Sequence, residues 1–191
     1  PPGTNILVSG PPLSGKRSLC LDVLTSGTDK GEGAIIVTTK DGADRVLDDF
    51  EKRTPYEDRP VAVVDCVTRQ QGVSDVRDTD RIKYTSSPVD MTGIGIKLSE
   101  FLQSFYQNQG IERNRVMLHS LSTLLMYSDL QTVFRFLHVF TGRVQSVDGL
   151  GIFAIDASAH DDQTMNTLKQ LFDGIITTQE DGGPSVRLAG D

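Results

Sequence analysis

Short apolar runs that alternate with amphipathic helical patterns constrain this chain more than any other feature. The run at residues 5–9 is followed by a helical pattern over residues 16–26, in which Leu19, Val23 and Leu24 share one face. Continuous apolar strands separated by helices predict a parallel sheet covered on both faces, because parallel neighbours need crossover connections. We therefore predict a three-layer α/β fold with main strands at residues 5–9, 33–39, 61–67, 115–120 and 151–156.

The other segments fit the same architecture. A minor strand is expected at residues 82–85 and a mobile surface loop at residues 68–80, where the sequence turns polar. The tail predicts a β-hairpin of residues 174–178 and 186–188, with its turn at 181–183. No linker or internal repeat interrupts the 191 residues, so we expect one domain over residues 1–191. Further helices are predicted at residues 44–52, 94–108, from the capping Asp129 onward, and at 162–172.

Composition narrows the partners and the cell compartment. The net charge of -7, with 20 Asp against 6 Glu, repels polyanions and argues against general nucleic-acid binding. No apolar run approaches the roughly 18 residues that cross a bilayer, and no secretory signal is visible, so we expect a cytoplasmic protein without a membrane partner. Cys20 and Cys66 lack metal-ligand spacing and are expected to be buried free thiols.

A phosphate-binding loop is the clearest functional motif. The segment satisfies the pattern G-x-x-x-x-G-K directly after a predicted strand and before a predicted helix, which is the context that this motif requires. Its glycines let backbone N–H groups point at phosphate oxygens, the helix N-terminus adds its dipole, and the lysine reaches the outer phosphates. The predicted nucleotide-binding residues of this loop are Gly10, Pro11, Pro12, Leu13, Ser14, Gly15 and Lys16.

The residue after the lysine departs from the motif. A Ser or Thr is required there because its hydroxyl holds Mg²⁺, but this chain has Arg17 and places Ser18 one residue later. One step along a helix turns a side chain by about 100°, so Ser18 does not replace the missing ligand. We include Arg17 and Ser18 among the nucleotide-binding candidates and predict no metal ligand.

Two further segments resemble the RecA/KaiC-like branch of P-loop ATPases. Residues 115–125 resemble its second motif, an apolar strand followed by Leu-Ser, and residues 172–176 resemble its late strand entry. The resemblance extends over nearly the whole chain and favours a degenerate single-domain member of haloarchaeal type. It implies the P-loop fold with ATP as ligand, and it implies rings or filaments with nucleotide near the subunit boundary. A homo-oligomer or a regulatory protein partner is therefore expected.

The departures from that family fall on its hydrolytic positions. The resemblance implies an Asp at the end of the fourth strand, where this chain has His119, and a Glu after the second strand, where it has Lys40 and then Asp41. Asp41 is the candidate catalytic base that remains. Lys40 and His119 are expected to face the terminal phosphate. Asp156, which ends the fifth strand, is a further nucleotide-facing candidate because ligands of open α/β folds gather at that edge.

These substitutions lead to a specific hypothesis. A triphosphate needs positive charge near its outer oxygens, and Arg17 and Lys40 can supply it in place of Mg²⁺. The sequence therefore predicts a nucleoside-triphosphate-binding domain that does not require Mg²⁺ and serves as a regulatory or assembly module. Two alternatives stay open, a slow ATPase that uses Asp41 and a protein-interaction scaffold that binds no nucleotide.

Three weaker signals are interpreted as structural. His160, Asp161 and Asp162 follow the fifth strand and are expected to start a helix, with phosphate or metal binding as the alternative. Ser120 and Ser122 lie near His119, but the G-x-S-x-G turn of a serine hydrolase is missing. The connections at residues 121–128 and 157–161 are short and without Lys or Arg, which argues against single-strand DNA binding.

Overall fold

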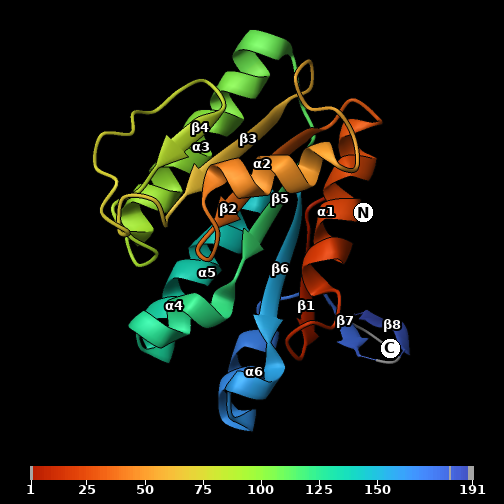
Figure 1. Ribbon diagram of the computed structural model, residues 1–191. Coiled ribbons are helices and arrows are strands. Elements are labelled where there is room, and N and C mark those ends of the chain that lie inside the picture. Colours follow the sequence, from red (N-terminus) through yellow and green to blue (C-terminus); the bar gives the residue numbers. More distant parts are fainter. Residues whose placement is uncertain (1, 181, 189–191) are drawn as a thin grey trace.

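A single mainly parallel sheet organises the molecule (Figure 1). The computed structural model describes residues 2–180 and 182–188. The strand order is β4-β3-β2-β5-β6-β1-β7-β8, and only the last pair, β7 and β8, is antiparallel. The strands are β1 (Thr4–Gly10), β2 (Gly33–Thr38), β3 (Val61–Asp65), β4 (Ile82–Tyr84), β5 (Asn114–His119), β6 (Leu150–Asp156), β7 (Gly174–Gln179) and β8 (Gly182–Leu188).

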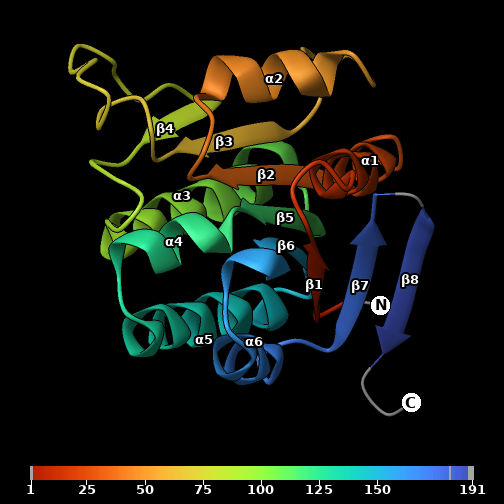
Figure 2. The same cartoon turned by 60° about the horizontal axis from the view of Figure 1, so that its bottom comes forward.

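Helices cover both faces of this sheet, so the sheet is the buried middle layer of three (Figure 2). One apolar cluster joins the sheet to α1 and α2, and a larger one joins it to α3, α4, α5 and α6. A short 3-10 turn, η1 (Ala157–Ala159), follows β6. The helices are α1 (Lys16–Thr28), α2 (Ala43–Glu51), α3 (Met91–Gln109), α4 (Leu121–Tyr127), α5 (Leu130–Ser146) and α6 (Asp162–Lys169).

The central strands are apolar because they are buried on both sides. Every residue of β2 and of β3 is buried, so neither strand shows the alternation of a half-exposed strand. Cys20 and Cys66 belong to the two clusters, and burial raises the pKa of each thiol to about 12. Both are free, as the sequence predicts.

The structure confirms the predicted fold class and the order of the main elements. The C-terminal hairpin is present as β7 and β8, while Asp181 of its predicted turn lies outside the described residues. Residues 68–80 carry neither helix nor strand. The prediction of one domain over residues 1–191 stays a prediction. Within the described part of the chain, no helix has the length and apolar character needed to cross a membrane.

One connection differs from its prediction. Residues 121–127 form helix α4, although they were expected to be a short connection. The Ser120 hydroxyl accepts a hydrogen bond from the Ser122 backbone N–H and so caps the helix. Leu121 and Leu124, three residues apart on one face, are fully buried in the larger apolar cluster. Burial of these two leucines explains why so short a segment is helical.

Candidate functional site

The predicted phosphate loop connects the end of β1 to the first turn of α1. Gly15 adopts a left-handed conformation with φ of 84° and precedes the helix at Lys16. Gly10 is needed for a different reason, because a Cβ there would clash with the Thr178 hydroxyl of β7. The hydroxyls of Ser14 and Thr178 lie 2.5 Å apart and fasten the loop to that strand. Gly15 and the contact of Ser14 with Thr178 thus set the curvature of the loop.

Lys16 extends across the inside of the loop. Its Nζ donates a hydrogen bond to the Pro11 carbonyl at 2.6 Å. Burial lowers the pKa of the Lys16 ammonium, while the nearby Asp156 carboxylate opposes this shift and Lys40 adds to it. Leu13 of the same loop is 98% exposed.

A pocket of ≈ 520 Å³ opens in front of the loop. It brings together the ends of four strands, because Gly10 pairs with Asp156 and Thr38 pairs with His119 in the parallel register. Eleven of the thirteen predicted site residues line it, and Gly10 and Pro11 do not. The lining consists of Pro12, Leu13, Ser14, Gly15, Lys16, Arg17, Ser18, Lys40, Asp41, Arg45, His119, Ser120 and Asp156.

Two of these lining residues were not predicted. Arg45 lies in the first turn of α2 and pairs with Asp41 at 3.3 Å. The i,i+4 spacing of Asp41 and Arg45 is the sequence signal that would have identified the pair. Ser120 is bonded to the end of β2, since Thr39 Oγ1 donates to its carbonyl at 2.9 Å and accepts from its N–H at 2.7 Å. The His119–Ser120 peptide bond is cis.

Arg17 points from α1 toward α2 and holds two carboxylates. Its Nη1 lies 3.2 Å from Asp41 Oδ2, and its Nη2 lies 2.7 Å from Asp49 Oδ2. The Arg17 side chain is 25% exposed and that of Asp41 is 13% exposed, so the first pair is largely shielded from water. Because Arg45 binds the other oxygen of Asp41, both oxygens of this carboxylate face a guanidinium.

His119 is neutral at physiological pH. It is only 8% exposed, and its burial together with the positive charges of Arg17 and Lys40 lowers the pKa of the imidazole to about 4. His119 therefore offers hydrogen bonds to a ligand rather than charge. This separates it from Lys40, which is exposed at the rim of the pocket and adds a positive charge there.

Four cationic side chains and two acidic ones line the pocket. The cationic groups are Lys16, Arg17, Lys40 and Arg45, and the carboxylates are Asp41 and Asp156. Asp156 is turned partly toward its own turn, where Oδ1 accepts hydrogen bonds from the N–H and hydroxyl of Ser158. A locally positive pocket is thus present on a protein whose net charge is -7.

Asp65 fixes the start of α2 and was not predicted as a site residue. It is fully buried at the end of β3, and its carboxylate accepts hydrogen bonds from the N–H groups of Ala43, Val67 and Thr68 and from the Thr68 hydroxyl. The bond to Ala43, 2.8 Å long, satisfies a free N–H in the first turn of α2. Asp65 thereby fixes the start of the helix that carries Arg45 and Asp49.

The Ser–His contact considered from the sequence involves a different histidine. Ser122 Oγ lies 2.8 Å from His160 Nε2 and accepts a hydrogen bond from the Asp156 N–H at 3.0 Å. Asp161 caps α6 by accepting from the Thr164 N–H, which is the helix start that the sequence predicts for this segment. The contact of Ser122 with His160 ties α4 to the turn that precedes α6.

The pocket suits phosphate better than it suits Mg²⁺. A curved loop, a helix N-terminus and a lysine together form the kind of site that binds phosphate groups in proteins. Arg17 has a guanidinium where the G-x-x-x-x-G-K-[S/T] pattern has a Mg²⁺-binding hydroxyl, and His119 in the same pocket is a neutral imidazole. Within residues 2–180 and 182–188, no three His, Cys, Asp or Glu side chains are grouped so that they could hold a metal ion.

Comparison with known proteins supports the architecture. Of the solved structures, 460 chains match, among them the KaiC-like protein PH0186 from the hyperthermophilic archaeon Pyrococcus horikoshii OT3. That similarity has a TM-score of 0.64 at 13% identity and covers 99% of this chain and 80% of the other, which establishes a shared fold. No curated protein matches the sequence. A family model described as "Family of unknown function (DUF7504)" matches residues 3–178, and the chain therefore belongs to that family.

Proposed function

We propose that this protein binds a nucleoside triphosphate, ATP in the first instance, in the pocket of the phosphate loop and without a requirement for Mg²⁺. The observation that carries the proposal is that Arg17 takes the sequence position of the Mg²⁺-binding hydroxyl of such a loop, while its guanidinium pairs with the nearby carboxylates of Asp41 and Asp49. The binding is regulatory or serves assembly, and hydrolysis is slow or absent.

Phosphate binding by the loop follows from its local chemistry. Successive N–H groups at the start of α1 and the Lys16 ammonium attract phosphate oxygens, and Lys40 and Arg45 extend the positive charge along the pocket. Among the described residues, Lys16 hydrogen-bonds only a loop carbonyl, which a phosphate oxygen can replace without leaving a buried carboxylate unpaired. Asp156, beside Lys16, faces the same space.

The arrangement of Asp41 argues against the slow ATPase. A general base must present a free oxygen to the attacking water, and each oxygen of Asp41 faces an arginine. Arg17 thus has two effects, since it removes the hydroxyl ligand of Mg²⁺ and engages the one carboxylate that the sequence offers as a base. Binding without turnover is the function that this geometry favours.

Titration of a fluorescent ATP analogue tests the proposal. The intact chain should bind it with a similar Kd in EDTA and in Mg²⁺, and Lys16→Ala should weaken binding by at least about tenfold. Lys30→Ala, which removes an exposed lysine at the far end of α1, is the matched control and should bind normally. Affinity that collapses in EDTA would contradict the metal-independent mode.

The two rival functions give different results in the same samples. Phosphate release well above that of Lys16→Ala would identify a slow ATPase. A thermal melt unmoved by millimolar ATP, ADP or GTP would identify a scaffold that binds no nucleotide, since a ligand that binds the native state must stabilise it. Sedimentation with and without nucleotide tests whether the chain assembles with copies of itself.

A further inference from the structure

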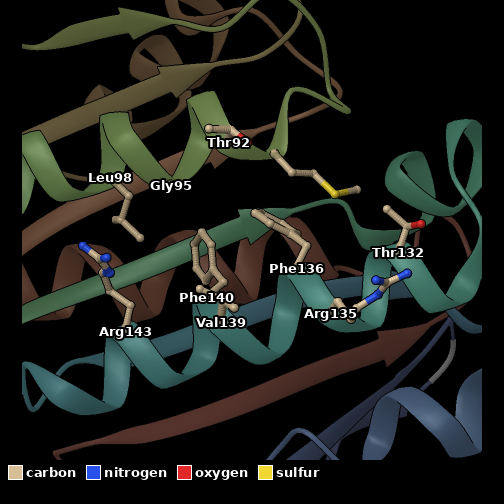
Figure 3. Close-up of a pocket in the computed structure, with 10 residues that line it drawn as sticks. Thr92, Gly95, Leu98, Thr132, Arg135, Phe136, Val139, Phe140 and Arg143 are labelled. Atoms are coloured by element: carbon tan, nitrogen blue, oxygen red, sulfur yellow. The ribbon is translucent and has the colours of Figure 1, made fainter.

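A second pocket lies between α3 and α5, in the helical layer opposite α1 and α2 (Figure 3). It is an open groove of ≈ 490 Å³ that shares no lining residue with the nucleotide pocket. Figure 3 shows Phe136 and Phe140 rising from α5 toward α3, with Leu98 approaching from the opposite side. The two phenylalanine rings pack edge to face, with their ring centroids 5.7 Å apart.

The groove has an apolar floor that is not fully covered. Leu98 and Phe140 are buried below it, while Met91 and Phe136 are half-buried and Val139 at its edge is 66% exposed. None of the ten lining residues is acidic. A large exposed valine beside aromatic side chains marks a surface that gains stability when a partner covers it.

Two arginines stand at opposite ends of the groove. Arg135 and Arg143 are both exposed and, with Val139 between them, occupy positions i, i+4 and i+8 on α5, so they are about 12 Å apart along the helix. Arg143 donates a hydrogen bond to the Ser99 hydroxyl of α3. Among the residues that the structure describes, neither arginine forms an ion pair. Arg135 acts on the Asp129 carboxylate through its charge, but no carboxylate among the described residues lies in direct contact with either guanidinium.

We propose that this groove docks an amphipathic helix of a partner protein, with an apolar stripe facing the floor and acidic side chains at both ends. The charge complementarity is specific, because two unpaired cations flank the groove on a protein of net charge -7. Apolar anchors at i, i+3 or i+4, and i+7 span about 10 Å, which matches the distance between the arginines.

A second copy of the chain fits the groove less well. Two copies that met groove to groove would bring their arginines together, and like charges facing each other across an interface cost several kcal/mol. An acidic helix from a different protein satisfies both the apolar floor and its charged ends.

Gly95 offers a way to close the groove without harm to the fold. It lines the groove from α3, and a Cβ built on it meets no atom within 4 Å. A large side chain at this position therefore enters the groove rather than the core, and replacing a helical glycine favours the helix. Gly95→Trp is the blocking variant, and Arg135→Glu is the charge variant.

Fluorescence anisotropy with defined peptides tests the proposal. The probe is a labelled helical peptide of about 16 residues with Leu at the anchor positions and Glu at both ends of this apolar stripe, compared with its Lys counterpart and a scrambled sequence. The intact chain should bind the Glu peptide at least about tenfold more tightly than either comparison peptide. Gly95→Trp and Arg135→Glu should each lose most of this binding, and Lys30→Glu, with the same change in net charge, should retain it.

The outcomes separate this site from its alternatives. Equal binding of the Glu and scrambled peptides, or full binding by Gly95→Trp, would overturn the proposal. Self-association that Gly95→Trp abolishes in sedimentation velocity would assign the groove to a second copy instead. A melting temperature of each variant within about 2 °C of the parent shows that the fold is intact, and nucleotide titration of the same variants keeps this test separate from that of the phosphate loop.

Discussion

Arg17 Nη1 lies 3.2 Å from Asp41 Oδ2, so the first turn of α1 is linked by charge to the loop that follows β2. A second pair from the same guanidinium, to Asp49, extends the link to the last turn of α2. Arg17 therefore connects two helices that lie on the same face of the sheet. It also places a positively charged side chain at the sequence position where the phosphate-loop pattern has a hydroxyl that binds a divalent cation.

Restoring the missing ligands should restore a metal requirement. In the double variant Arg17→Thr and His119→Asp, the hydroxyl and the carboxylate return to the positions from which this type of loop holds Mg²⁺. We expect the ratio of Kd in EDTA to Kd in Mg²⁺ to rise from about 1 in the parent to about 10 or more. Isothermal titration of ATP in both buffers measures it.

The single variant Arg17→Thr serves as a control for that experiment. It removes the ion pairs of Arg17 with Asp41 and Asp49, so it should lower the melting temperature while the Kd ratio stays near that of the parent. If the double variant binds ATP equally well in EDTA and in Mg²⁺, the two positions do not control metal use.

His119 should make stability depend on pH in the mildly acidic range. Its pKa is about 4 in the folded protein against 6.5 when unperturbed, so between these values the unfolded chain binds a proton that the folded chain does not. The free energy of unfolding should therefore rise with pH in this window, by up to about 1.4 kcal/mol per pH unit, and fall as the pH is lowered through it.

Urea unfolding at several pH values between 4 and 7 measures this contribution. His119→Gln should unfold with a shallower pH dependence than the parent in that window, because the imidazole is gone while the carboxylates still titrate. Parallel curves for the two proteins would show that the buried imidazole does not control acid stability.

Removal of Asp65 should destabilise the protein strongly. Asp65→Ala leaves the N–H groups of Ala43, Val67 and Thr68 without their acceptor in the interior, which should cost about 3 kcal/mol or more of the free energy of unfolding. Chemical denaturation gives the value. Asp58→Ala, at an exposed position shortly before β3, is the control and should change the free energy of unfolding by less than about 0.5 kcal/mol.

Gly10→Ala should damage the phosphate loop. The added methyl group would collide with the hydroxyl of Thr178 and approach that of Ser14, so the loop must move away from β7. We expect a loss of about 1–3 kcal/mol in stability together with weaker ATP binding. Gly142→Ala, on helix α5, is the control for a glycine-to-alanine change without a clash, because a Cβ there meets nothing within 4 Å. It should leave ATP binding unchanged and raise stability slightly.

The fold could be predicted because its main signals are local. Strands such as β2 are buried along their whole length, so each appears in the sequence as a continuous apolar run, and an amphipathic helix such as α2 shows a helical periodicity. The gathering of loop and strand-end residues in one pocket was also predictable, since parallel strands end at the same edge of the sheet.

Features that depend on distant partners could not be predicted. Asp65 acts through Ala43, 22 residues away, and nothing in the spacing of the two residues marks the bond. Helix α4 is too short for a periodic pattern and forms because Leu121 and Leu124 find a core to enter. The groove between α3 and α5 arises only when two helices pack, so its arginines, Arg135 and Arg143, carry no signal in the sequence. The positive charge of the phosphate-loop pocket, by contrast, was predicted from Arg17 and Lys40.

The three-layer arrangement has a thermodynamic consequence. The phosphate loop leads into α1 in one outer layer and the groove is built by α3 and α5 in the other, so a bound nucleotide and a docked helix do not touch. If the sheet between them stays rigid, each ligand binds with the same affinity in the presence or absence of the other, and the coupling free energy is zero. A measured coupling other than zero would therefore report a movement of the sheet itself, transmitted from one helical layer to the other.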